Sequence, residues 1–295
     1  VNRRKKYACK QCEETIKLAP LPKTAIPKSI ATPSLLASML VAKFCDHLPL
    51  YRQEQIWIRH GIDIPRQTLS NWVQKCATLL CKVVDAMKTI IVASNYARAD
   101  ETTVQVLKEE NRDPSTKSYM WIFMTGLKTN NHIVFEYHPT RGAEAASNFF
   151  AGFQGYLQSD AYSGYNALRK IKGITDVGCM AHSRRKFTDV TKIVTKTGKA
   201  HEALKYIKAL YVIEDKIKNW TDDDRYQYRQ EHSKIILDKF KIWLDGSINH
   251  VPPKNPLGQA INYAINNCAA LTRYLDHGML DIDNNWCENQ IRLLA

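Results

Sequence analysis

The sequence predicts an α/β fold, a mixed sheet with flanking helices, preceded by a helical region and interrupted by a long all-helical insertion. Within residues 96–182, short apolar runs typical of buried strands alternate with one amphipathic stretch. Residues 183–280 instead carry long stretches with apolar side chains at helical spacing. The same helical spacing fills residues 34–92, ahead of the first expected strand.

These patterns divide the chain into three segments, and a chain of 295 residues can hold more than one structural unit. Residues 1–33 are rich in Lys, Pro and Thr around one Cys-x-x-Cys pair, and their prolines predict an extended linker. Residues 34–92 form the helical region. Residues 93–295 hold the mixed sheet, with the helical insertion at about 183–280.

Three helices are expected in the helical region. Ser34 is the expected N-cap of the first, the second covers 50–60, and the third covers 68–80. The connection at 61–65 matches helix-turn-helix spacing, although a simple helical hairpin that packs on the next domain or on a second copy fits equally well. In the helix-turn-helix interpretation, the side chains that open the recognition helix and face DNA are Arg66, Gln67, Ser70 and Asn71.

The order of elements after residue 96 is that of a ribonuclease-H-like core: three strands, a helix, a strand that ends in an aspartate, and a further strand. A closing helix begins near Asn284 or Asn285. The expected strands are 97–107, 119–125, 132–137, 156–159 and 174–179, with a helix at 141–153. The expected helices of the insertion are 201–220, 225–244 and 257–270.

Charge and composition narrow the functional classes. Lys and Arg exceed Asp and Glu by 42 − 29 = 13, which favours a nucleic-acid partner over a merely basic soluble protein. No apolar run approaches the roughly 18 residues of a membrane span, and no apolar segment follows the basic first residues, so neither a membrane protein nor a signal peptide is expected. The cysteines at 45, 76, 81 and 268 are expected as small core residues in a reducing cytoplasm.

Three acidic side chains fall where this core would bring them together. Asp100 lies on the first strand, Asp160 follows the fourth, and Glu288 lies in the first turn of the closing helix. Each alone can serve as a turn former, a cap or a partner of the helix dipole. Together they predict a site for two Mg²⁺ or Mn²⁺ ions about 3.5–4 Å apart, because cations offset the repulsion among three carboxylates.

Two neighbouring acids are excluded from this set. Glu101 is expected on the opposite face of the strand from Asp100, because side chains alternate along a strand. Asp283 is expected in the N-terminal cap region of the closing helix. The predicted metal-binding acids are therefore Asp100, Asp160 and Glu288, one from each acidic segment.

The segments around these acids resemble the transposases of the insertion sequence 66 family, a group of DDE-type bacterial transposases. The matching runs occur in order through nearly the whole chain and are specific in combination. They are HLPLYRQE (47–54), ADET (99–102), QSDAYSGY (158–165), AHSRRKF (181–187) and IDNN (282–285) with Glu288. The resemblance implies that Asp100, Asp160 and Glu288 are the catalytic acids. It also implies a helical insertion between the last two, which lie 288 − 160 = 128 residues apart.

The chain departs from the family pattern near its last acid. Trp286 and Cys287 stand where the family commonly has a small residue or proline and one further residue ahead of the glutamate. Asn289 stands where the family usually has arginine. Family members also continue beyond Ala295 with a further basic and helical segment. Glu288 itself is retained and is therefore kept in the predicted site.

Two Cys-containing pairs have the spacing of metal ligands. Cys9 and Cys12 match one half of a tetrahedral zinc site, and the resemblance implies a zinc-finger-like module whose other cysteine pair lies upstream. Residues 1–33 would then hold part of that module. Cys179 and His182 also have ligand spacing, but a joint site with the first pair is disfavoured because the two pairs belong to different units.

The stretch that begins at His182 is expected near the acids. His182 is expected to support them or to contact a DNA phosphate, with a hydrogen-bonded core histidine as an equal alternative. Arg184, Arg185 and Lys186 follow directly and can grip phosphates, with a solvated helix face as the alternative.

The function that these observations predict is a DNA transposase of a bacterial insertion sequence. Two divalent cations would activate water to cut the element ends and then activate the freed 3′-hydroxyl to attack target DNA. The expected setting is the bacterial cytoplasm at the nucleoid, with the protein bound as a homo-oligomer to terminal repeats and target DNA. Two alternatives stay open: another ribonuclease-H-like nuclease, and a catalytically inactive DNA-binding remnant.

Overall fold

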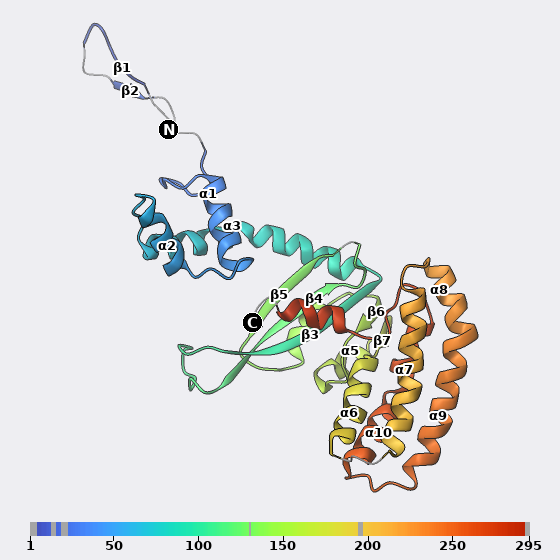
Figure 1. Cartoon of the computed structure of the whole chain (residues 1–295). Helices are drawn as coiled ribbons and strands as arrows, with labels where there is room; N and C mark the ends of the chain where they lie inside the picture. The colour runs from blue at the N-terminus through green and yellow to red at the C-terminus, as the bar shows by residue number, and fades with distance from the viewer. Residues whose placement is uncertain (1–4, 13–15, 19–22, 130, 194–196, 293–295) are drawn as a thin grey trace. The chain divides into compact units, whose positions relative to one another are not determined.

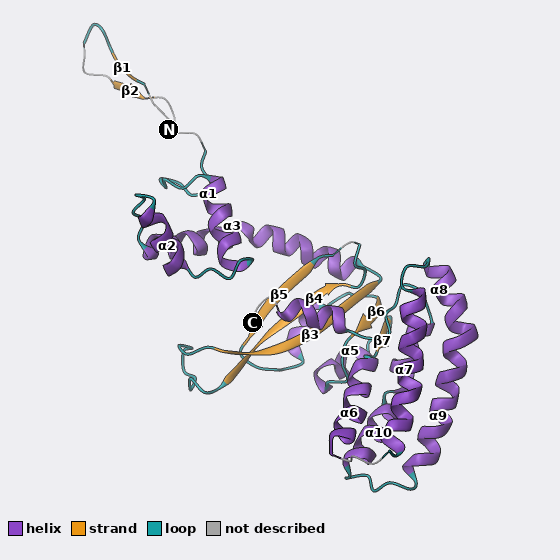
Figure 2. Ribbon diagram, in the orientation of Figure 1, coloured by secondary structure: helices purple, strands orange, loops and turns teal. Residues whose placement is uncertain are grey.

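The computed structural model describes residues 5–12, 16–18, 23–129, 131–193 and 197–292. The chain forms two compact units, Val1–Val83 and Val84–Ala295, whose elements are labelled in Figure 1 and coloured by type in Figure 2.

The first unit opens with a small hairpin. β1 (Lys6–Ala8) pairs antiparallel with β2 (Ile16–Leu18). Cys9 and Cys12 lie in the connection between the two strands, the usual place for a pair of metal ligands on a hairpin.

Among the described residues that follow in this unit are three helices, α1 (Pro33–Phe44), α2 (Leu50–Arg59) and the start of α3 (Arg66–Ala93). Gln53 of α2 is buried, and its side-chain amide donates to the backbone oxygens of Met39 (3.2 Å) and Leu48 (3.1 Å). A small apolar core joins the helices; its buried members are Ile26, Ala31, Leu36, Met39, Ile64, Leu69, Trp72 and Cys76.

Two boundaries in this unit differ from the sequence prediction. The N-cap of α1 is Thr32, whose hydroxyl accepts from the amide of Leu35 at 3.2 Å, so the predicted cap at Ser34 was wrong. Pro33 explains the shift, because proline suits the first position of a helix and Thr32 is then the residue that must cap it. α3 continues 13 residues beyond its predicted end at residue 80, since no Gly or Pro interrupts it.

The second unit is built on a five-stranded sheet in the order β5-β4-β3-β6-β7. β3 pairs antiparallel with β4, and β4 with β5, whereas β3–β6 and β6–β7 are parallel. The predicted α/β fold with a mixed sheet is therefore confirmed. The strands are β3 (Tyr96–Gln105), β4 (Lys117–Thr125), β5 (Ile133–His138), β6 (Gly155–Gln158) and β7 (Ile174–Val177).

Opposite faces of this sheet receive different helices. Trp121 and Phe123 of β4 face a core that includes Phe149 of α4 (Glu144–Phe149). Ile122 and Met124 point the other way, as alternation along a strand requires, and pack on α12 (Asn285–Ile291). α12, red in Figure 1, lies over β3 and β4. The short α5 (Asn166–Arg169) precedes β7.

The predicted all-helical insertion is a bundle beside the sheet (Figure 1). Its buried side chains include Phe187, Ile207, Leu210, Phe240 and Ile261, which bring all of its long helices into one core. The helices are α6 (Met180–Ile193), α7 (Lys199–Ile217), α8 (Asp222–Tyr228), α9 (Lys234–Ile248), α10 (Pro256–Asn266) and α11 (Cys268–Thr272). A π-helical turn, Arg229–Ser233, joins α8 to α9.

The cysteines behave less uniformly than predicted. Cys76 is buried as expected, but Cys45 and Cys81 are exposed and Cys268 is half-buried, so the core assignment was wrong for these three. Helical spacing places a residue on a helix, but it does not reveal how much of that helix is covered.

Across the described residues, no helix combines the length and the apolar character that crossing a membrane requires.

Candidate active site

The sheet places two of the predicted acids side by side. β3 and β6 are parallel neighbours, with Arg98 opposite Gln158. Asp100 and Asp160 each lie two residues beyond this pair, in the same direction along adjacent strands. The pairing of β3 with β6 ends at Arg98 and Gln158, so both acids lie just past the last paired residues of the two strands.

Asp100 occupies a site that resists a negative charge. Burial, with smaller contributions from the charges of Glu101, Glu288 and Asp160, raises its pKa to about 8, against one hydrogen bond from the amide of Glu101 at 2.9 Å. Both Asp160 and Glu288 are thus close enough to Asp100 to affect its ionisation. With this pKa the carboxyl group is mostly protonated at neutral pH, and a bound cation would favour its ionised form.

The third acid reaches the other two because α12 is hydrogen-bonded to β3. The side-chain amide of Asn284, the N-cap residue of α12, donates to the backbone oxygen of Ala99 at 3.0 Å. The guanidinium of Arg98 donates to the backbone oxygen of Asp283 at 3.2 Å. The strand that bears Asp100 therefore fixes the first turn of the helix that bears Glu288.

Trp286 and Cys287, which depart from the family pattern, both serve this docking. Cys287 is fully buried against Ile122 and Met124 of β4. The guanidinium carbon of Arg98 lies over the ring of Trp286, 5.2 Å from the centroid of that ring. The altered local sequence therefore helps to hold α12 on the sheet.

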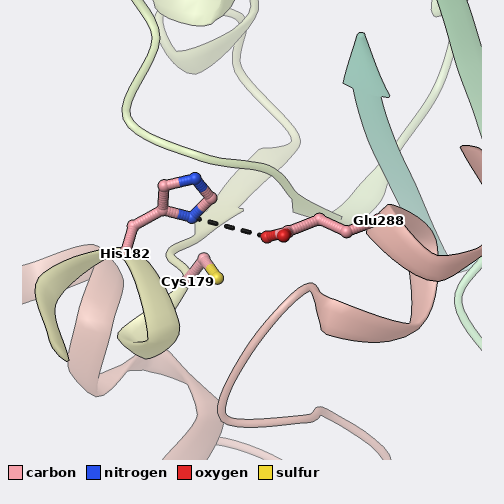
Figure 3. Close-up of side chains that lie close together, drawn as sticks. All are labelled: Cys179, His182 and Glu288. Atoms are coloured by element: carbon pink, nitrogen blue, oxygen red, sulfur yellow. Dashed lines mark ion pairs between the residues drawn. The ribbon is translucent and has the colours of Figure 1, made fainter. Parts of the chain in front are cut away.

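Glu288 lies between two basic side chains of α6. One carboxylate oxygen is 3.6 Å from Nδ1 of His182, and the other is 3.4 Å from a guanidinium nitrogen of Arg185. His182 is half-buried beside this carboxylate. Among the described residues, its Nδ1 and the facing oxygen Oε1 of Glu288 are buried without a hydrogen-bond partner. Figure 3 shows the two groups facing each other, with the thiol of Cys179 beside them.

The loop after Asp160 is held by its own hydrogen bonds. A carboxylate oxygen of Asp160 accepts from the amide of Tyr162 at 2.9 Å, and its backbone oxygen accepts from Arg169 at 2.6 Å. Tyr263 of α10 lies nearby, since burial and the charge of Asp160 both raise the pKa of its hydroxyl. The helical insertion therefore borders Asp160.

The two acids excluded on sequence grounds have other partners. Glu101 is buried and accepts from Nε of Arg141 at 2.8 Å and from the hydroxyl of Tyr165 at 2.7 Å. Asp283 accepts from the amide of Asn285 at 3.1 Å and from the hydroxyl of Tyr211 at 2.7 Å. These contacts give Glu101 a role in the core and Asp283 a role at the start of α12.

The three cations that follow His182 are exposed along α6. Arg184 lies 4.7 Å from the ring centroid of Tyr211, and Lys186 lies 4.8 Å from that of Tyr263. Arg185 is 57% exposed while it contacts Glu288, so its guanidinium is available to a phosphate at the same place.

The acids supply the donor atoms that a pair of hard cations requires. Carboxylate oxygens are the preferred ligands of Mg²⁺ and Mn²⁺. In the described part of the chain, a group of possible metal ligands whose donor atoms all lie within 4.8 Å of one another consists of Cys179, His182 and Glu288. This group does not include Asp100 or Asp160. Sequence reasoning missed this grouping, because no local pattern links residue 288 to the Cys-x-x-His pair.

The raised pKa of Asp100 predicts how stability depends on pH. Its unfolded pKa is 3.8 and its folded pKa is about 8, so folded protein holds this proton over a range where unfolded protein has released it. Metal-free protein should therefore lose stability as pH rises through this range, by about 2 kcal/mol or more. Thermal unfolding with a chelator at about pH 6 and about pH 9 measures this slope. Asp100→Asn should flatten it, whereas Asp189→Asn, an exposed acid of α6, should not; equal slopes in all three proteins would contradict the assignment.

Comparison with known proteins agrees with this architecture. The family profile described as "Transposase IS66 family" matches residues 28–295. Two similar proteins of Sinorhizobium fredii (strain NBRC 101917 / NGR234), "Uncharacterized protein y4jD" and "Uncharacterized protein y4qI", are 30% and 31% identical over 303 and 305 residues. These matches take in 99% of this chain but only 59% and 56% of the two relatives, so the chain spans less than two thirds of their length. With the family profile covering nearly its whole length, the chain belongs to the Transposase IS66 family.

Proposed function

We propose that this protein cuts the ends of a bacterial insertion sequence and joins them to target DNA, with Asp100, Asp160 and Glu288 as the acids that hold two divalent cations. The observation that carries the proposal is the convergence of three acids: one on β3, one just after the adjacent strand β6, and one on a helix that is hydrogen-bonded to β3. Structural acids on separate elements have no reason to be brought together in this way.

Each acid has a distinct part in this proposal. When bound, Mg²⁺ or Mn²⁺ ions would lower the pKa of the attacking hydroxyl and stabilise the leaving oxygen. Asp100, whose pKa is raised to about 8, would hold one of the ions through its carboxylate and would give up its proton to do so. Asp160 and Glu288 complete the oxygen ligands. On its other side the Glu288 carboxylate faces His182 at 3.6 Å and Arg185 at 3.4 Å.

The cations of α6 would hold the DNA backbone beside this site. Arg185 and Lys186 are exposed where α6 borders Glu288 and Tyr263. Phosphate contacts of this kind position DNA without reading sequence, and they weaken as salt rises. His182 can contact a phosphate there as well, since it lies 3.6 Å from Glu288 and is part-exposed.

Sequence-specific contacts are proposed for the start of α3. Arg66, Gln67 and Asn71 are exposed there, and Ser70 is half-buried. Gln67 donates to the side chain of Asn71 at 3.1 Å, which pre-orients both amides for a base edge. The helices α2 and α3 with their short connection are compatible with a helix-turn-helix.

We expect the double substitution Arg66→Ala/Asn71→Ala to weaken binding to the element's terminal repeat by about tenfold or more, because each base or phosphate contact contributes about 1–3 kcal/mol. Fluorescence anisotropy with a labelled repeat and an unrelated duplex measures it. Lys82→Ala, which alters an exposed cation of the same helix about three to four turns further on, is the matched control. Unchanged affinity in the double variant would instead favour the helical hairpin.

The test of the proposed reaction is the identity of its products. Incubated with its own terminal-repeat duplex, a target plasmid and Mg²⁺ or Mn²⁺, the protein should yield nicked ends and then joined products. Nicking without joining in every condition would favour another nuclease. Metal-independent binding with neither product would favour an inactive DNA-binding remnant. We expect the active form to be a homo-oligomer on DNA in the cytoplasm, at the nucleoid.

A further inference from the structure

A thiol, an imidazole and a carboxylate converge at one corner of the second unit. Cys179 follows β7, His182 lies in the first turn of α6, and the amide of His182 donates to the backbone oxygen of Cys179 at 3.2 Å. Glu288 approaches from α12, 106 positions further along the chain than His182. The donor atoms of all three lie within 4.8 Å of one another (Figure 3).

Two of these donor atoms lack hydrogen bonds that they would normally have. Nδ1 of His182 and Oε1 of Glu288 are both buried without a hydrogen-bond partner among the described residues. They lie 3.6 Å apart, too far for a hydrogen bond. Buried polar atoms nearly always have a bonding partner, so this pair points to a bound ion that contacts both atoms. A distance of 3.6 Å is close to the about 3.4 Å that separates N and O ligands around a tetrahedral zinc ion.

We propose that Cys179, His182 and Glu288 bind a single Zn²⁺-type ion, with the fourth position open to water. The combination of sulfur, nitrogen and oxygen donors selects a borderline-soft ion over Mg²⁺, which prefers oxygen alone. Closing the group from 4.8 Å to the roughly 3.6 Å expected around zinc requires movements of about 1 Å. The thiol proton is released to solvent as the Zn–S bond forms. The amide of Asn284, 3.2 Å from the sulfur, then donates to the thiolate.

This site would share one ligand with the catalytic group. A carboxylate that completes a zinc site is withdrawn from the pair of cations held with Asp100 and Asp160. Zinc would therefore inhibit DNA cleavage, a consequence that rests on the proposed function, whereas zinc binding itself does not. The same three residues would give the enzyme a sensitivity to zinc that competes with magnesium.

Cobalt is the probe of choice, because a thiolate bound to Co²⁺ gives a near-ultraviolet charge-transfer band. The experiment uses the protein with Cys9→Ser/Cys12→Ser, which removes the cysteine pair of the hairpin. Titration with Co²⁺ should give this band at one ion per chain, and Zn²⁺ should abolish it. Cys179→Ser should lose the band and His182→Ala should weaken Co²⁺ binding at least about tenfold. Cys268→Ser, which alters a half-buried thiol outside the group, should retain it.

The outcomes separate binding from inhibition. Absence of the band in the parent protein, or its persistence in Cys179→Ser, would overturn the zinc site. Thermal unfolding of each variant, with and without Zn²⁺, gives a second readout: Zn²⁺ should raise the midpoint of the parent and of Cys268→Ser but not of Cys179→Ser. In cleavage assays, Zn²⁺ should slow the parent at least about tenfold more than Cys179→Ser, each relative to its own Mg²⁺ rate. Equal slowing would overturn inhibition through this site, while failure of all cleavage would refute the proposed function and leave the cobalt result standing.

Discussion

Asp160→Asn should lower cleavage of the terminal-repeat duplex by at least about a hundredfold and leave the fold intact. A metal ligand contributes several kcal/mol to transition-state stabilisation, and about 2.7 kcal/mol is already a factor of a hundred. The carboxylate makes one local hydrogen bond, to the amide of Tyr162, which an asparagine oxygen can also accept. Initial rates of nicking with Mg²⁺, beside circular dichroism and thermal unfolding, measure both parts of the prediction.

The same loss is expected for Asp100→Asn and Glu288→Gln. Asp189→Asn is the matched control, since this exposed acid of α6 pairs with Lys192 and not with the site. Cleavage by Asp160→Asn at a rate comparable with that of the control would remove Asp160 from the catalytic group. A collapse of thermal stability in Asp160→Asn alone would show instead that this acid is structural.

Arg98→Met should produce the largest loss of stability, about 3–5 kcal/mol, because it breaks a buried charge network. The guanidinium is 1% exposed and contacts the carboxylate of Asp281, the backbone oxygens of Gly126 and Asp283, and the ring of Trp286. Its removal leaves Asp281 without its nearest cation. The midpoint temperature of thermal unfolding should fall by about 10 °C for a unit of this size.

Lys128→Ala is the control for this prediction, because Lys128 also approaches Asp281, at 3.5 Å, but is 63% exposed. An exposed pair contributes about 1 kcal/mol at most, so this variant should unfold almost like the parent. Equal losses in both variants would mean that the Asp281 carboxylate, rather than the buried guanidinium and its contacts to the start of α12, determines stability. Arg98→Met should also slow cleavage, because the helix that bears Glu288 loses one of its attachments to β3.

Local patterns in the sequence predict the strands of the sheet and the elements that bear the three acids. Buried strands are short apolar runs, and an acid close behind such a run marks the strand's end, as Asp160 does two residues after β6. The alternation along β3 separated Glu101 from Asp100, and Glu101 indeed contacts Arg141 and Tyr165. Period and alternation are local properties, so they can be read without knowing the fold.

Features that depend on distant partners could not be read in this way. Arg98 sits in a strand with no local sign of burial, and two of its partners, Asp281 and Asp283, lie 183 and 185 positions away. The contact of His182 with Glu288 and the docking role of Cys287 likewise arise only when α12 returns to the sheet. The predicted helix at 141–153 shortens to Glu144–Phe149, and Arg141 is used instead to pair with Glu101. Tertiary contacts outweigh helical spacing at such positions.

The central claim is that Asp100, Asp160 and Glu288 together hold the catalytic cations. Anomalous scattering from Mn²⁺ in crystals of the protein bound to its terminal-repeat duplex tests it most directly. The account predicts two Mn²⁺ peaks about 3.5–4 Å apart, in contact with carboxylate oxygens of all three acids. Mn²⁺ peaks that contact none of these acids, or bound DNA with ordered Asp100 and Asp160 but no Mn²⁺ beside them, would contradict it.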